Sequence, residues 1–334
     1  MKILIVGAGA VGLVYGHHFA NAGHQVTFMV KEKYQAQLNQ EKEAGVVLYH
    51  LNSDKKLLKP QYFKSFESIN HWDDAQGFDL VALAISSNAL RQLPLDQIEQ
   101  TLIGTDTDLL MLQPSATDFE HLSQVIVKEK IFQGMISLIS YQTDEVNQNI
   151  KPAGTAYYLP PMPMPISAST ENRQTRLTNI VSLFQDSAIP AKAVKSAIDD
   201  SKIPSAFLMT FLCALEAANW EFKRLGQSAD LLKKLSAAQQ SLLPQQITEK
   251  GFSNSLKRSS LTLLLKVFLR PGLYKLLLKM APRFVPLPLE AYLKKHFMKV
   301  RPQTVIYMQE YKDLYPVNAV TELNQLLHRY SKTI

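Results

Sequence analysis

The sequence predicts an α/β protein whose N-terminal domain is a doubly wound parallel sheet and whose C-terminal domain is all helical. Three observations lead to this prediction. A short β-branched strand is followed at once by a glycine turn and a helix. Apolar strands then alternate with helical segments, and beyond Asp199 helical periodicity continues without a clear strand. We therefore expect domains at residues 1–197 and 198–330, the first of Rossmann type.

The first elements form a βαβ unit. Residues 2–6, KILIV, predict a strand, and a helix is expected through Ala22, with Gly23 at its C-terminal cap. Residues 25–30, QVTFMV, predict the second strand. This order is typical of a parallel sheet, in which the glycine turn lies at the carboxyl edge of the first strand.

Later strands are expected at 78–86, 108–113, 131–142 and 191–196, with a helix at 173–186. Residues 157–167, YYLPPMPMPIS, contain four prolines, so we expect a loop or an edge region there. In the helical domain we expect breaks at glycines and prolines, near Gly226, Pro244, Gly251, Pro271–Gly272 and 282–288.

Composition and charge limit the classes of function. The single cysteine, Cys213, excludes an internal disulfide and favours a reducing compartment, so we expect a cytoplasmic protein. The sequence has no uninterrupted run of about 18 apolar residues, so no membrane-spanning helix is expected. The histidines have no metal-ligand spacing, so no metal is expected. The net charge is +7, and residues 256–301, with seven lysines, four arginines and one glutamate, carry +10 of it.

The glycine turn has the pattern G-x-G-x-x-G between a strand and a helix, which predicts a dinucleotide site. The first glycine permits the turn, the second admits the pyrophosphate, and the third lets helix and strand pack closely. The expected cofactor contacts are Gly7, Ala8, Gly9, Ala10, Val11 and Gly12. The second strand ends at Lys31, where an NAD site usually has an acid, so we expect NADP(H) with Lys31 facing the 2′-phosphate. Alternatively, Lys31 is a solvated loop lysine, and Glu32 follows it.

These residues resemble the ketopantoate reductase (2-dehydropantoate 2-reductase) family. The resemblance runs from KILIVGAGAVG and GHQVTFMVK through DLVALAIS and LLMLQPSA to the helix after Asp200. It implies an NADPH-dependent reductase of a 2-keto acid or ketone, a helical second domain and an active site between the domains. A small keto substrate, a role in pantothenate biosynthesis, and a monomer or homodimer are expected with it.

The family's long helix carries a lysine with asparagines four and eight positions later, on one helix face. Here Lys202 matches the lysine, while Ala206 and Thr210 replace the asparagines. A placement three residues later would put Ser205 at the lysine. The resemblance implies that Lys202 protonates the carbonyl oxygen. The helix dipole disfavours a cation near a helix N-terminus, so helix stability does not explain a lysine there. A solvated lysine is the alternative.

Other family positions differ here. A lysine after the third inner strand is replaced by Ser86, and a cofactor-binding H-N-G-like turn by Gln113-Pro114-Ser115. We expect Ser86 and Gln113 to contact cofactor. Thr210, Asn219 and Gln303 are expected to contact substrate, although a threonine in an apolar helix more often bonds its own backbone. The family's C-terminal glutamate has no clear match; the nearest region offers His296, Gln303 and Glu310.

The basic, leucine-rich segment 256–301 has three interpretations: a core-facing helix pair, an apolar wall that selects a bulkier substrate, or an amphipathic, reversible contact with an anionic membrane or a partner. Nucleic acid is not expected, because no binding motif is present. The leading hypothesis is the reductase. Its rival is a protein of the same fold that binds NADP(H), or senses redox state, without catalysis.

Overall fold

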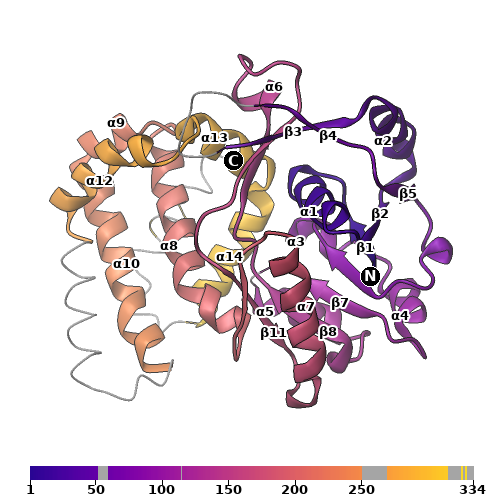
Figure 1. Ribbon diagram of the computed structural model, residues 1–334. Helices are drawn as coiled ribbons and strands as arrows, with labels where there is room; N and C mark the ends of the chain where they lie inside the picture. The colour runs from indigo at the N-terminus through magenta and orange to yellow at the C-terminus, as the bar shows by residue number, and fades with distance from the viewer. Residues whose placement is uncertain (52–58, 114, 250–268, 315–324, 326–327, 329–334) are drawn as a thin grey trace. The chain divides into compact units, whose positions relative to one another are not determined.

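The computed structural model describes residues 1–51, 59–113, 115–249, 269–314, 325 and 328. For Ile203, 242–249, Phe284 and 312–314 it describes the backbone alone. The chain divides into two compact units, Met1–Asp200 and Ser201–Ile334 (Figure 1). The first unit is α/β, and the described part of the second is helical.

The first unit is built on an eight-stranded sheet of order β12-β11-β8-β7-β6-β1-β2-β5. Neighbouring strands are parallel except β8 and β11, which are antiparallel. The parallel core of the predicted sheet is therefore confirmed, and the chain reverses once within it. The strands are β1 (Lys2–Val6), β2 (Gln25–Met29), β5 (Glu67–Ile69), β6 (Leu80–Leu83), β7 (Asp108–Met111), β8 (Ile131–Gly134), β11 (Met164–Ala168) and β12 (Ala191–Ala193).

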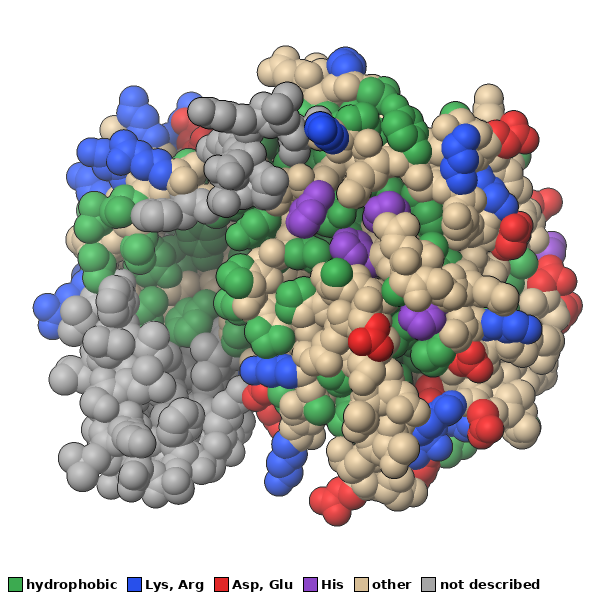
Figure 2. Space-filling view, in the orientation of Figure 1, with side chains coloured by type: hydrophobic (Ala, Val, Ile, Leu, Met, Phe, Trp, Pro, Cys, Tyr) green, Lys and Arg blue, Asp and Glu red, His purple; other side chains and the backbone are tan. Residues whose placement is uncertain are grey.

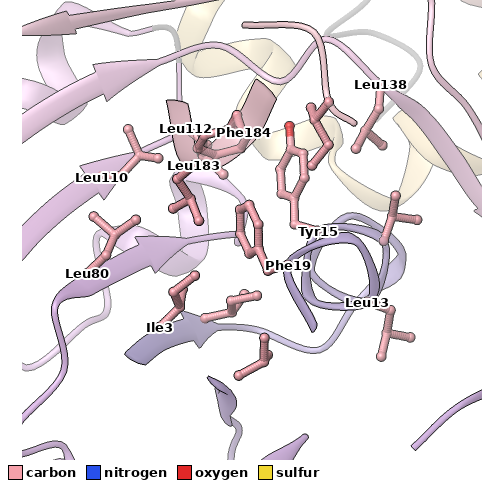
Figure 3. Packing of buried hydrophobic residues seen from close by; sticks show 14 of the residues in the cluster. Ile3, Leu13, Tyr15, Phe19, Leu80, Leu110, Leu112, Leu138, Leu183 and Phe184 are labelled. Atoms are coloured by element: carbon pink, nitrogen blue, oxygen red, sulfur yellow. The ribbon is translucent and has the colours of Figure 1, made fainter. Parts of the chain in front are cut away.

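Both faces of this sheet are covered, which explains its continuous apolar strands. Successive side chains of β1 enter opposite cores: Ile3 and Ile5 pack in one, and Leu4 and Val6 in the other. On the first face, Phe19 stacks edge-on against Phe184, with ring centroids 5.1 Å apart (Figure 3). The helices of this unit are α1 (Ala10–Asn21), α2 (Glu32–Ala44), α3 (Ser87–Leu90), α4 (Leu95–Leu102), α5 (Ala116–Ser123), α6 (Thr143–Val146) and α7 (Gln174–Asp186).

A second sheet, of order β4-β3-β10-β9, was not predicted. Its strands are β3 (Val46–His50), β4 (Gln61–Phe63), β9 (Ile139–Gln142) and β10 (Thr155–Tyr158), and strands β9 and β10 contact α1. The expected strand 131–142 is thus two strands in two different sheets. The ring of His50 stacks on Tyr157 at 4.8 Å, and His18 meets the same ring edge-on at 5.5 Å.

The loop or edge region expected at 157–167 has strand residues at both ends. Tyr157 and Tyr158 end the inner strand β10, and β11 begins at Met164, beside the edge strand β12. Pro165 is tolerated because the residues on either side of it make the bonds to β12, Met164 through its N–H and Ile166 through its carbonyl oxygen, and pairing with β8 starts only at Ile166.

The described part of the second unit consists of helices α8 (Ala197–Ala217, which begins in the first unit), α9 (Phe222–Gln227), α10 (Ala229–Glu249), α12 (Pro271–Phe284), α13 (Leu289–Lys299) and α14 (Arg301–Leu314). The break expected at Pro244 is wrong, because α10 continues through it. Helix α12 begins at Pro271, where a proline needs no N–H partner. Gly251 lies outside the described residues.

Candidate functional site

The glycine turn joins β1 to α1 at the carboxyl edge of the large sheet. Gly7 has φ +102°, and its N–H donates to the carbonyl oxygen of Met29 at 2.9 Å. A side chain at Gly7 would be strained and would also lie 2.9 Å from the Ala84 carbonyl oxygen. At Gly12, a Cβ would lie 2.0 Å from the Gly7 carbonyl oxygen. Both positions therefore require glycine for local reasons.

Gly9 differs, because a Cβ built there meets no atom within 4 Å. It is the N-cap of α1, makes no side-chain cap, and no acidic residue occupies the first turn. The N–H groups at a helix N-terminus and the helix dipole favour an anion. Open space in front of an acid-free helix end fits a pyrophosphate, with Ala8, Ala10 and Val11 partly exposed around it.

Lys31 lies at the same sheet edge as the glycine turn. Strands β1 and β2 are parallel with Val6 opposite Met29, and Lys31 follows two residues later as the N-cap of α2. Its side chain is exposed. Lys33 lies over the ring of Tyr34, with its Nζ 4.8 Å from the ring centroid. The start of α2 therefore presents two lysines next to one acid, Glu32.

Ser86 and Gln113 follow β6 and β7, the next strands of the sheet. The Ser86 hydroxyl accepts from Ala89 N–H at 3.3 Å and caps α3. Gln113 is 3% exposed, and its Nε2 donates to the carbonyl oxygens of Leu83 and Ile85. Its Oε1 accepts from Leu112 N–H at 3.0 Å. The Gln113 amide thus joins the ends of the two strands, a role that the sequence did not indicate.

Arg91 and Asp118 form an ion pair near these loops that the sequence analysis missed. Arg91 Nε donates to Asp118 Oδ1 at 3.0 Å, and its Nη2 donates to the Thr117 hydroxyl at 2.8 Å. Asp118 is fully buried in the first turn of α5. Because α3 ends at Leu90, the pair connects the segments that follow β6 and β7.

Lys202 lies in the second unit, in the early turns of α8, and is half-buried. Ala206 and Thr210, four and eight residues later, are buried. The Thr210 hydroxyl donates to the Ala206 carbonyl oxygen at 2.8 Å and accepts from Gln239 Nε2 at 3.2 Å. Gln239 in turn accepts from the Tyr274 hydroxyl. Thr210 is therefore held by its own backbone and by α10.

Asn219 and Gln303 lie away from Lys202. Helix α14 runs antiparallel to α8, because Tyr311 bonds Ser205 while Arg301 pairs with Glu216 at 2.7 Å. Gln303 therefore lies toward the Asn219 end of α8. Roughly 22 Å of helix separates Lys202 from Ala217, where α8 ends. The exposed Asn219 has φ +58° and closes the helix end, as asparagine does readily.

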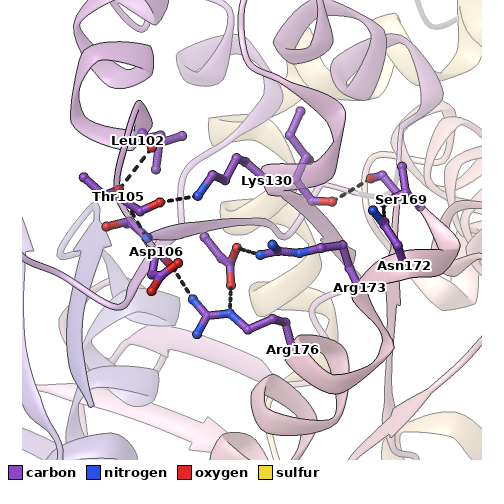
Figure 4. Close-up of polar contacts among 12 residues, drawn as sticks. Leu102, Thr105, Asp106, Lys130, Ser169, Asn172, Arg173 and Arg176 are labelled. Carbon is purple, nitrogen blue, oxygen red and sulfur yellow. Dashed lines mark hydrogen bonds and ion pairs between the residues drawn. The ribbon is translucent and has the colours of Figure 1, made fainter.

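The Cys213 thiol and the Asp108 carboxylate are also buried. Burial raises the pKa of the Cys213 thiol, which is 1% exposed. Asp108, at the amino end of β7, accepts from Arg173 and from Arg176 Nε at 2.8 Å (Figure 4). Burial raises the Asp108 pKa, and the two guanidinium charges oppose that rise. Asp108 and the glycine turn lie at opposite edges of the sheet, so this cluster is separate from the candidate cofactor site.

Among the described residues, no group of three or more His, Cys, Asp or Glu side chains is arranged to hold a metal. No helix in that part of the chain has the length and hydrophobicity required to cross a bilayer.

Comparisons with known proteins agree with this geometry. The family model described as "Ketopantoate reductase PanE/ApbA" matches residues 3–160. An uncharacterised oxidoreductase of Bacillus subtilis, YkpB, is 27% identical over 135 residues, which are 40% of each protein. The matched region thus covers less than half of that relative.

Solved structures match the whole chain at low identity, which shows the fold. The 2-dehydropantoate 2-reductase of Geobacter metallireducens has a TM-score of 0.65 at 14% identity, covering 100% of both chains. A D-mandelate dehydrogenase solved with NADH and anilino(oxo)acetate has a TM-score of 0.64 at 16% identity, covering 100% of this chain and 99% of that one.

Proposed function

We propose that this chain, which belongs through its residues 3–160 to the ketopantoate reductase PanE/ApbA family, is an NADPH-dependent reductase of a 2-keto acid or ketone. The observation that carries the proposal is the turn at Gly7, Gly9 and Gly12. Two of its glycines are required by the backbone, and the third leaves space before a helix end that favours an anion.

The cofactor would be held by the carboxyl edge of the large sheet. The glycine turn and the first turn of α1 would hold the pyrophosphate. Lys31 would pair with the 2′-phosphate, which makes NADPH the preferred cofactor. Ser86 and Gln113 would act by fixing the segments after β6 and β7 at this edge. When bound, the nicotinamide supplies a hydride to the carbonyl carbon of the substrate.

Lys202 would supply the proton that the carbonyl oxygen requires as negative charge develops on it. The argument rests on its match to the family's lysine and on its half-buried position in the second turn of α8. Substrate contacts by Thr210, Asn219 and Gln303 stay predictions. Because the Thr210 hydroxyl already donates to the Ala206 carbonyl oxygen, Lys202 is the residue to test first.

The test follows oxidation of NADPH with ketopantoate and with phenylglyoxylate, a bulkier 2-keto acid related to mandelate. The wild type is compared with Lys202→Met, Lys202→Arg and the exposed-lysine control Lys294→Met. We expect turnover that falls at least about 100-fold in Lys202→Met, the usual scale for general acid catalysis. NADPH binding and the control variant should be unchanged.

Each other result changes the proposal. Full turnover in Lys202→Met would remove this lysine as the acid and favour the placement with Ser205. Tight NADPH binding without turnover of either substrate would favour the binding or redox-sensing protein. Failure to bind NADPH or NADH would contradict the proposed function as a whole.

A further inference from the structure

Helix α12 exposes more apolar and basic surface than packing within the described part of the second unit explains. It packs through Tyr274 and Leu278, one turn apart: the Tyr274 hydroxyl bonds Gln239 of α10, and Leu278 is 6% exposed. On the rest of the helix, Leu276 and Leu277 are 49% and 44% exposed. Lone exposed leucines are ordinary, but adjacent ones among cations indicate a contact surface.

Basic side chains surround these leucines. Lys275, Lys279 and Arg283 are exposed at four-residue spacing, so they form one stripe beside Leu276. Helix α9 packs alongside, since a Cβ at Gly226 would lie 3.9 Å from Lys275 Cγ, and α9 adds the exposed Lys223. Figure 2 shows Lys and Arg side chains gathered over α9 and α12. We call these six residues the α9–α12 surface.

Few acids lie next to this surface in the part of the chain that the structure describes. The sequences of α9 and α12 contain no acid; Glu221, just before α9, pairs with Arg224 at 2.7 Å, and Glu290 accepts from Phe222 N–H. A second copy of the chain, docked by the same face, would bring these cations against one another. The cations of the α9–α12 surface therefore favour an anionic partner. The exposed leucines favour a partner into which apolar side chains can insert.

We propose that the α9–α12 surface binds the anionic surface of a phospholipid membrane, reversibly and without spanning it. Lysine and arginine stems extend along apolar surface while their charged ends reach the headgroups, and Leu276 and Leu277 enter the headgroup–acyl boundary. The cations of α12 also belong to the most basic stretch of the sequence, because residues 256–301 carry +10 while the rest of the chain carries −3. This proposal does not depend on the proposed reaction.

The experiment is co-sedimentation of the full-length protein with vesicles of phosphatidylcholine alone and of phosphatidylcholine mixed with phosphatidylglycerol. We expect binding to the mixed vesicles only, with release at high salt because screening removes the charge attraction. Lys275→Glu/Lys279→Glu should weaken binding about 25-fold or more, since each lysine near such a surface contributes about fivefold. Leu276→Ser/Leu277→Ser should weaken binding without changing its dependence on phosphatidylglycerol.

The matched control is Lys128→Glu/Lys192→Glu, which makes the same change in net charge with two exposed lysines of the first unit. It should bind nearly as the wild type does; an equal loss would show that net charge alone acts and would overturn the proposal. Absence of binding to mixed vesicles, or equal binding to both kinds, would also overturn it. So would a dimer of the wild type that Leu276→Ser/Leu277→Ser dissociates. Should the leucine variant fail to fold, the charge variant decides.

Discussion

The three glycines of the turn after β1 meet different surroundings, which separates folding from binding at single residues. Gly12→Ala should cost about 2–3 kcal/mol of stability, because its Cβ would collide with the Gly7 carbonyl. Gly9→Ala should fold normally but weaken NADPH binding, because the added methyl occupies the space proposed for the pyrophosphate. Thermal unfolding and NADPH titration measure the two effects. Equal loss of stability in both variants would contradict this assignment.

Lys31 is the residue on which cofactor choice is proposed to depend. Lys31→Ala should raise the KM for NADPH about 10- to 100-fold, the usual contribution of a charge-assisted hydrogen bond. The KM for NADH should change little, because NADH has no 2′-phosphate. Lys42→Ala is the control, since Lys42 pairs with Glu67 at 2.9 Å at the other end of α2. An equal rise for both cofactors would contradict the prediction.

At the scale of elements, helix α1 carries the glycine turn at one end and paired histidines near the other. His17 is 6% exposed, and burial followed by the nearby His18 lowers its pKa from 6.5 to about 4. Asn21 Nδ2 lies 3.0 Å from His17 Nε2, so the amide donates and the ring must accept. Burial also lowers the pKa of His18 and of His50. The contact between α1 and the small sheet therefore favours neutral rings, most strongly at the buried His17.

These pKa shifts predict how stability depends on pH. Because the folded state lowers the pKa, the unfolded chain binds more protons below pH 6.5. The contribution of His17 is therefore complete above pH 6.5 and is lost as the pH falls toward 4. The Tm of His17→Gln should fall less steeply over this range than that of the wild type. Parallel curves would exclude His17 as the cause.

For the molecule as a whole, local signals and long-range contacts differ in how well the sequence predicts them. The turn at Gly7–Gly12 was predictable because its requirements are set by neighbouring residues and one adjacent strand. The sheet edge that brings Lys31 close follows from parallel pairing. The small sheet was missed because β3 and β10 pair across about a hundred residues.

The roles of the candidate site residues were also hard to predict, because they depend on contacts between residues distant in sequence. Nothing near Gln113 in sequence reveals that its amide bonds the end of β6, and nothing near Thr210 reveals Gln239 of α10. Pro165 suggested a loop because the pattern cannot tell which of two neighbouring strands requires its missing N–H. Such roles depend on pairs of residues distant in sequence, so they become visible in the structure.

The stability of the first unit should depend on Asp108, where β7 meets α7. Asp108→Asn removes the charged acceptor of Arg173 and Arg176 and should cost about 1–3 kcal/mol, the usual scale for a lost hydrogen bond to a charged group, because both arginines are partly exposed. Urea unfolding measures the loss. NADPH affinity of the folded variant should not change, because Asp108 lies at the far edge of the sheet; a weaker affinity would contradict that separation.

Helix α8 begins in the first unit, where Ala197 N–H donates to the Ser167 hydroxyl at 2.9 Å, and the division between the units falls after Asp200. Pro204 lies inside this helix and has no N–H to donate to the carbonyl oxygen of Asp200. The missing backbone bond thus coincides with the division. A helix bends at least cost where an interior bond is missing. Lys202 lies in the turn that lacks this bond, so the backbone that carries it is held less rigidly than the rest of α8.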